Sequence, residues 1–118
     1  MLNWKNSKGS MVGSSLKGYI KASHDELVRV FGLPEDVDGD KVSTQWTVKA
    51  GSTRSIQYSI YDYKMTNVYE DDLMSPEQFR ALPSYEWHIG GFDNKYVSDL
   101  ADFLSEKLGR KVEFKVGY

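Results

Sequence analysis

Two neighbouring segments of the sequence alternate between apolar and polar residues, and they constrain the fold more than any other feature. The first is KVSTQWTVKA, residues 41–50, and the second is RSIQYSIYDYK, residues 54–64. Alternation is typical of a β-strand with one buried face, and the loop AGST contains residues common in turns. The two segments therefore predict a hairpin. Its two rows of like-facing residues are Val42, Thr44, Trp46 and Val48 in the first strand and Ile56, Tyr58 and Ile60 in the second.

Two main helices are predicted, one on each side of this hairpin in the chain. The first follows Ser23, which forms a capping-box pattern with Glu26. The second is expected to be capped by Asp93 and to end at Gly109. A shorter helix is predicted to begin at Ser75-Pro76, where Ser75 forms a second capping-box pattern with Gln78. The apolar stripes comprise Leu27, Val30 and Phe31 in the first helix, and Val97, Leu100, Ala101, Leu104 and Leu108 in the longer one.

Three more strands are predicted at 16–22, 86–89 and 111–116, the last with Val112, Phe114 and Val116 on one side. The order of elements predicts an α+β fold: a small, mostly antiparallel sheet of about five strands with two main helices.

The domain organisation is expected to be simple. The length of 118 residues fits one domain, which we place at residues 17–118. Residues 1–16 show no period and are expected to be a flexible lead-in, with Trp4 and Val12 as candidate anchors.

Composition excludes several classes of protein. The chain has no cysteine, which rules out disulfide scaffolds and thiolate metal sites and fits a reducing cytoplasm. A net charge of −2 argues against a binder of long nucleic acids. No apolar run approaches the roughly 18 residues of a membrane span. We therefore expect a cytoplasmic protein without a membrane, metal or cofactor requirement.

The glycine pair in YEWHIGGFDNKYV, residues 85–97, needs an explanation, because glycine weakens both strands and helices. Either a turn there requires positive φ, or another group approaches the backbone closely. A strand followed by Gly90-Gly91 and a helix N-terminus would present backbone N–H groups to a phosphate or carboxylate. Asp93 places a like charge at that position, so a tight turn without a ligand remains an alternative.

Other candidate residues are less specific. His24 and His88 lack the partners of a zinc site. His88 with Asp93 is a weak candidate for an acid–base pair. Arg54 precedes a tyrosine-rich strand, and Arg110 follows the longer helix. Each suits a phosphate beside a stacked base, a protein interface or a solvated rim.

Aromatic residues make up 14% of the chain. Strands favour aromatic residues, and contact surfaces favour Tyr and Trp as well. Because one small sheet cannot bury all of them, we expect a homo-oligomer, a dimer or higher.

The order of motifs GYIKASHDELVRVFGLP, DGDKVSTQWTVKAG, IQYSIYDYK and WHIGG, followed by a helix, resembles the first Thoeris anti-defence family of phage proteins. The resemblance covers about residues 17–108. It implies a non-catalytic sponge in the host cytoplasm, which sequesters cyclic ADP-ribose-type signals made by TIR-domain defence proteins. It also implies oligomers that hold the signal at a subunit junction. The ligand-binding residues implied are Trp87, His88, Gly90, Gly91, Asn94, Arg54 and Arg110.

Two alternatives stay open beside this interpretation. One is a phage inhibitor of the anti-CRISPR type, which would dock on a host defence protein through its tyrosine-rich surface. The other is a small hydrolase that uses His88.

Overall fold

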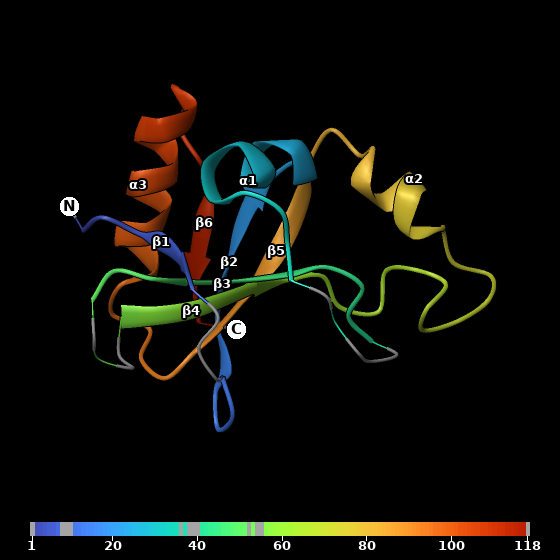
Figure 1. Ribbon diagram of the computed structural model, residues 1–118, viewed down its shortest axis with the longest axis horizontal. Coiled ribbons are helices and arrows are strands. Elements are labelled where there is room, and N and C mark those ends of the chain that lie inside the picture. Colours follow the sequence, from blue (N-terminus) through green and yellow to red (C-terminus); the bar gives the residue numbers. More distant parts are fainter. Residues whose placement is uncertain are drawn as a thin grey trace.

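The computed structural model describes residues 2–7, 11–35, 37, 41–51, 53 and 56–117 (Figure 1). Over these residues the chain forms an α+β fold with six strands and three helices. The strands are β1 Lys5–Ser7, β2 Ser15–Ala22, β3 Gln45–Lys49, β4 Gln57–Tyr61, β5 Tyr85–Gly91 and β6 Phe114–Val116. The helices are α1 His24–Phe31, α2 Pro76–Arg80 and α3 Val97–Leu108.

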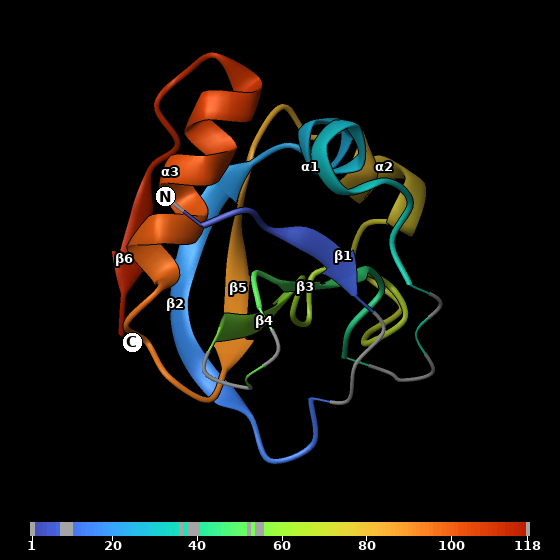
Figure 2. The same ribbon diagram turned by 60° about the vertical axis from the view of Figure 1, so that its left-hand side comes forward.

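All six strands join one antiparallel sheet in the order β1-β3-β4-β5-β2-β6. In Figure 1, β3 and β4 run across the view while β2, β5 and β6 stand nearly upright, so the sheet is strongly twisted. Helices α1 and α3 lie on the same side of it, and α3 crosses in front of β2 in Figure 2. The predicted hairpin is confirmed as β3 and β4, with Trp46 opposite Ile60 and Val48 opposite Tyr58.

The core lies between the sheet and the helices, and it uses every second residue of the central strands. Trp46 and Trp87 are fully buried and meet edge to face, with ring centroids 5.4 Å apart. The indole N–H of Trp87 donates to the carbonyl of Ala22 at 2.9 Å, and that of Trp46 donates to Gly32 at 2.9 Å. The polar atoms of the two largest core side chains are thereby satisfied.

The N-terminal segment is more ordered than its composition predicted. Lys5–Ser7 forms β1 against β3, and Ser15 begins β2, so the expected flexible lead-in contains regular structure. Trp4 is 3% exposed, stacks on Tyr58 with centroids 5.5 Å apart and donates to Asp99 at 2.9 Å. The short polar strand has no apolar alternation of its own, so this Trp4 anchor explains why it forms. Val12, the other candidate anchor, is 79% exposed.

The capping boxes predicted for α1 and α2 are confirmed. Ser23 and Glu26 bond reciprocally at the start of α1, and Ser75 and Gln78 do so at the start of α2.

The expected cap of α3 is wrong, because this helix begins at Val97 with Tyr96 as N-cap. The carboxylate of Asp93 accepts instead from the backbone N–H of Lys95 at 2.8 Å, inside a turn. The Tyr58 hydroxyl donates to the carbonyl of Asp93 at 2.6 Å and accepts from the N–H of Tyr96 at 3.0 Å. A side chain from β4 therefore fixes the start of α3.

The ends of two predicted strands also differ. β3 begins at Gln45, so Val42 and Thr44 precede it. Of the three apolar residues grouped near the C-terminus, only Val112 is buried, while Phe114 and Val116 are 39% and 50% exposed. β6 is a three-residue edge strand, and Val112 is the last of the described residues that belongs to the buried core.

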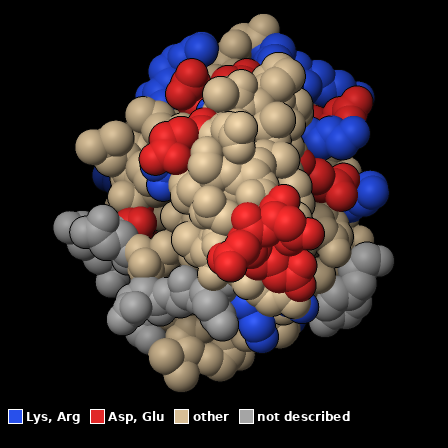
Figure 3. Space-filling view, turned by 90° about the vertical axis from the view of Figure 1, so that its right-hand side faces the viewer, with Lys and Arg blue, Asp and Glu red and all other residues tan. Residues whose placement is uncertain are grey.

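Charge is unevenly distributed over the surface. Figure 3 shows acidic side chains gathered on the side that carries α2 and the segment between β4 and α2, where Glu70, Asp71 and Asp72 are exposed. None of the described helices has the length and apolar character to cross a bilayer.

Candidate functional site

The glycine pair lies inside the sheet, and the predicted turn is not present. Gly90 and Gly91 are the last two residues of β5, and they pair with Leu16 and Ser15 of β2 and with Ser59 and Tyr58 of β4. Neither has positive φ. Because they lie between two strands, their backbone groups belong to the ladder, and α3 begins only at Val97.

Close approach explains the glycines, and the approaching groups belong to β4. A Cβ atom at Gly91 would lie 2.5 Å from Cδ1 of Tyr58, and one at Gly90 would lie 2.7 Å from the hydroxyl of Ser59. Tyr58 is fully buried. The second alternative raised by the sequence is therefore correct, with neighbouring side chains in the place of a ligand.

The other predicted site residues are dispersed. Trp87 is completely buried in the core. Asn94 is exposed and borders a pocket of about 280 Å³ that Lys17, Phe92 and Asp93 help to line. Arg54 lies outside the described residues. Of the predicted set, His88 lies on the surface of the sheet that the helices leave uncovered.

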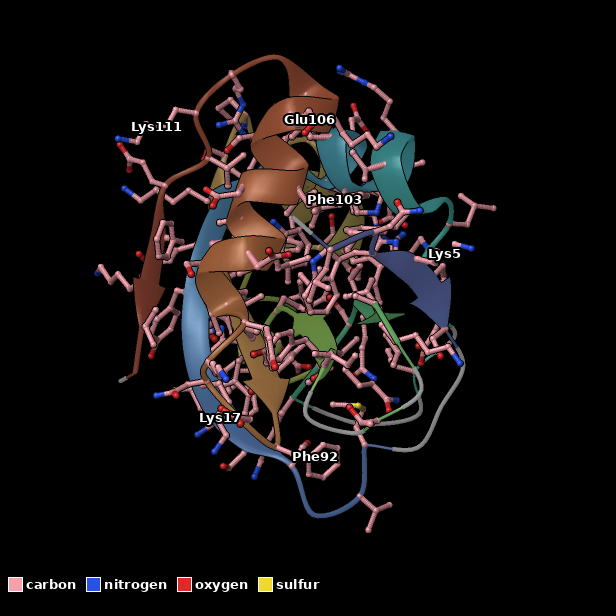
Figure 4. All side chains as sticks on the ribbon, turned by 90° about the vertical axis from the view of Figure 1, so that its left-hand side faces the viewer. Lys5, Lys17, Phe92, Phe103, Glu106 and Lys111 are labelled. Carbon is pink, nitrogen blue, oxygen red and sulfur yellow. The ribbon has the colours of Figure 1, made fainter. Side chains whose placement is uncertain are left out.

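Arg110 is at the other end of the molecule from the glycine pair. Its guanidinium donates to both carboxylate oxygens of Glu26, at 2.7 and 2.6 Å, and to the carbonyl of Lys21 at 3.4 Å. Lys21 and Ser15, the partner of Gly91, are six residues apart on β2, which corresponds to about 20 Å at roughly 3.3 Å per residue. Figure 4 likewise shows Lys111 and Phe92, the neighbours of Arg110 and Gly91, at opposite ends.

Three tyrosines surround His88 on the open face of the sheet, and we call this group the His88 cluster. The register aligns Tyr19 of β2, His88 of β5 and Tyr61 of β4 in one row. The ring of Tyr61 stacks on His88 at 5.4 Å with an interplanar angle of 28°, Tyr19 meets it edge-on at 5.1 Å, and Tyr63 lies at 5.7 Å. Because side chains alternate along a strand, the rings of Tyr19, His88 and Tyr61 point away from the helices, opposite to Trp87 and Ile60.

Burial makes the cluster an uncharged aromatic surface. It lowers the pKa of His88, so the imidazole is neutral at pH 7. Burial also raises the pKa of Tyr61, and the nearby hydroxyls of Tyr63 and Tyr19 act in the same direction. Among the described residues, the His88 ring has one hydrogen-bond partner, the Tyr85 hydroxyl, at 3.5 Å from Nδ1.

Lysines stand at both ends of the cluster. Lys115 of β6 lies 6.0 Å from the ring centroid of Tyr19, and Lys64 lies 5.2 Å from that of Tyr63. Lys64 has a φ of 57°, the one positive φ among the described non-glycine residues. Such a conformation costs free energy and is found often at functional sites.

A pocket of about 360 Å³ adjoins the Tyr19 end of the cluster. Lys21 pairs with Glu113 at 3.3 Å and Lys115 pairs with Glu86 at 3.3 Å, all of them lining residues. Lys111 also lines the pocket, and the described residues include no carboxylate within 4.0 Å of its ammonium. Three lysines against two glutamates leave the pocket with a net positive charge.

This arrangement joins a stacking surface to a cationic pocket, which suits a ligand with both a planar ring and a phosphate. The sequence indicated the tyrosine-rich strand after Arg54, which carries Tyr58, Tyr61 and Tyr63, but sequence reasoning missed Tyr19. Tyr19 directly precedes Ile20 in an alternating strand, so the two side chains lie on opposite faces and Tyr19 is on the open face. Only the register shows that Tyr19 lies beside His88.

The described residues contain no group of three or more His, Asp or Glu side chains that could hold a metal ion. His24 and His88 lie on different faces of the sheet, because His24 packs against the core residue Trp46 at 5.5 Å. Comparison of the chain with models of known protein families, and with curated proteins, gave no match.

Proposed function

We propose that this protein is a non-catalytic binder that sequesters a cyclic ADP-ribose-type immune signal and so blocks Thoeris defence. The observation that carries the proposal is the His88 cluster with its adjoining cationic pocket. A signal of this class combines a purine ring with a diphosphate. The rings of Tyr19 and His88 offer the stacking surface, and Lys111 and Lys115 offer the counter-charge.

Sequestration requires affinity alone, without stabilisation of a transition state. A neutral imidazole packed among tyrosine rings is suited to stacking. Hydrogen bonds from lysine to phosphate oxygens are charge-assisted and are among the stronger polar contacts in proteins. The order of sequence motifs supports the same class of ligand through the resemblance to the first Thoeris anti-defence family.

An oligomer would reconcile the implied site residues with their positions. Within one copy, about 20 Å of β2 separates Arg110 from the glycine pair. If Asn94 and Arg110 contact the same ligand, they do so from two copies, as expected for a signal held at a subunit junction. Light scattering at micromolar concentration is expected to show a dimer or a larger assembly, and a monomer would contradict this part of the proposal.

Titration calorimetry with a TIR-generated cyclic ADP-ribose tests the binding site. Tyr19→Leu removes a ring on which the purine stacks, and Lys111→Gln removes a positive charge that would contact the phosphates. Each is expected to weaken binding at least tenfold, which corresponds to about 1.4 kcal/mol. Lys107→Gln is the matched control, since Lys107 lies on α3 over the ring of Phe103. Wild-type affinity in both Tyr19→Leu and Lys111→Gln would remove the cluster and pocket from the site.

A heat-release experiment separates the classes of function. The protein is incubated with the signal, denatured by heat, and the released small molecules are identified by mass spectrometry. A sponge returns the intact signal, whereas a hydrolase returns a product. A protein that docks on a host defence protein leaves the signal free before heating.

A further inference from the structure

A second pocket lies among α1, α2 and the segment that leads into β3, and it shares no residue with the His88 cluster or its pocket. Its volume of about 420 Å³ falls in the range of roughly 300–1,000 Å³ that is usual for ligand sites. The walls combine apolar and polar side chains. They are His24, Leu33, Pro34, Glu35, Val37, Ser43 and Arg80.

Buried polar atoms without partners are concentrated in this pocket. Six such side-chain atoms occur among the described residues, and three of them belong to residues that line it: Nε2 of His24, Oε1 of Glu35 and Nε of Arg80. A polar atom removed from water without a partner costs free energy. Because three of them belong to residues that line one cavity, a molecule bound there is the candidate partner.

The three atoms define a hydrogen-bonding pattern. Arg80 Nε can only donate, and the Glu35 carboxylate accepts. Nδ1 of His24 lies 3.6 Å from a carboxylate oxygen of Asp25, which favours the tautomer with its proton on Nδ1 and leaves Nε2 as an acceptor. These three lining residues therefore supply one donor and two acceptors that have no partner among the described residues.

Charge excludes simple ions as the preferred ligand. Glu35 and Arg80 carry opposite charges, and no ion pair joins them among the described residues. Burial lowers the pKa of His24, so the imidazole adds no charge at pH 7. An anion would meet the carboxylate, and a cation would meet the guanidinium, so a neutral ligand is favoured.

We propose that this pocket binds a planar, uncharged group that carries an NH₂ group beside a hydrogen-bond acceptor. The acceptor takes the hydrogen of Arg80 Nε, and the two NH₂ hydrogens go to Glu35 and His24. Two kinds of small molecule present this edge: an adenine base, through its amino group and ring nitrogen, and a primary carboxamide such as nicotinamide. Leu33, Pro34 and Val37 provide apolar contacts for the rest of the ring.

The two histidines allow the site to be located directly, because the chain contains no others. In a ¹H–¹³C NMR spectrum of the full chain, each imidazole gives its own Cε1–H signal, and His88→Gln identifies which is which. Adenosine and nicotinamide are the probes. Inosine, with a carbonyl and a ring N–H, and nicotinic acid, with a carboxylate, are the controls with a mismatched edge.

We expect adenosine or nicotinamide to shift the His24 signal at millimolar concentration or below. Whichever of the two binds more tightly shows whether the pocket prefers an adenine base or a primary carboxamide. Inosine and nicotinic acid are expected to bind at least tenfold more weakly than their matched probes. Arg80→Met should weaken binding at least tenfold, whereas Arg29→Met, at an exposed position of α1, should leave it unchanged.

Several results would overturn the proposal. They are an unshifted His24 signal with both probes, equal binding of the mismatched analogues, or unchanged binding in a folded Arg80→Met variant. A shift confined to His88 would also count against this pocket and would favour the cluster instead. Failure here leaves the proposed sequestration site intact, because Tyr19→Leu and Lys111→Gln test that site separately.

Discussion

The two faces of β5 have opposite roles, although their residues alternate along one strand. Trp87 and Ile89 are fully buried beneath the helices, and the indole of Trp87 is hydrogen-bonded to a neighbouring strand. His88 points the other way and is surrounded by tyrosine rings on the open face. The buried face of β5 is closely packed in the core, whereas its open face carries partly exposed rings that lie between Lys64 and Lys115.

The comparison shows why one motif can mislead. WHIGG reads as a continuous site in the sequence, but its odd-numbered residues face the core and its even-numbered residues face the open surface. The glycines follow the same division, with Gly91 against Tyr58 of the core and Gly90 against Ser59 on the open face.

Truncating one residue on each face of β5 is the strongest test of whether the two faces differ in their contribution to stability. Trp87→Ala should lower the free energy of unfolding by about 3–5 kcal/mol, because it leaves a large cavity and an unpaired carbonyl at Ala22. His88→Ala removes half-buried ring contacts and should cost about 1 kcal/mol. Urea denaturation followed by circular dichroism measures both. Equal losses would mean that the open face carries as much packing energy as the core.

The glycine pair offers a finer version of the same test. Gly91→Ala places a methyl group against the fully buried ring of Tyr58 and should cost about 1–3 kcal/mol by overpacking. Gly90→Ala meets the Ser59 hydroxyl, which can rotate, so its cost should be smaller. The midpoints of urea denaturation of the two variants decide the order. A larger loss in Gly90→Ala would contradict the assignment of the two faces.

The Glu26–Arg110 pair should affect stability rather than ligand binding at the His88 cluster. The Arg110 guanidinium lowers the pKa of Glu26 to about 2. A depressed carboxyl pKa stabilises the fold above its unfolded value near 4.5, and this contribution is lost as the pH falls through about 2. Because the pair is at the surface, Arg110→Ala should cost only about 0.5–1 kcal/mol at pH 7.

Urea denaturation of the wild type and Arg110→Ala at pH 7 and pH 2.5 checks this, and the difference between them should shrink at the lower pH. A difference that is independent of pH would exclude the ion pair as its cause.

The smallest expected effect is the pH response of the open face. Burial lowers the pKa of His88 below its ordinary value of 6.5, so the unfolded chain binds a proton first as the pH falls. Stability should therefore decline below pH 6.5. His24, whose pKa is also lowered, contributes in the same direction. Denaturation midpoints at pH 7.5 and 5.5 should differ less in His88→Gln than in the wild type, and an identical decline would assign the response to His24 alone.

Candidate sites were harder to predict than elements, and Arg110 shows the reason. Its place after a helix predicted an exposed cation, but its partner Glu26 is 84 residues away in the chain. The polar pocket shows the same limit, because His24, Glu35 and Arg80 come from three separate segments. Nothing in the local sequence around these three residues indicates a site, and only their meeting at one pocket does so.

The sequence by itself determined the local structure: the hairpin, the two capping boxes and the apolar stripe of α3 each follow from residues close together in the chain. Tertiary structure decided what is non-local. Trp4 orders a polar segment as an edge strand by stacking on Tyr58, and the Tyr58 hydroxyl fixes the start of α3 where Asp93 was expected to do so. The register of β2, β5 and β4 brings Tyr19, His88 and Tyr61 together. Periodicity indicates which face a side chain occupies, but the neighbour that it meets there depends on strand order and register, and these are set by contacts between distant segments.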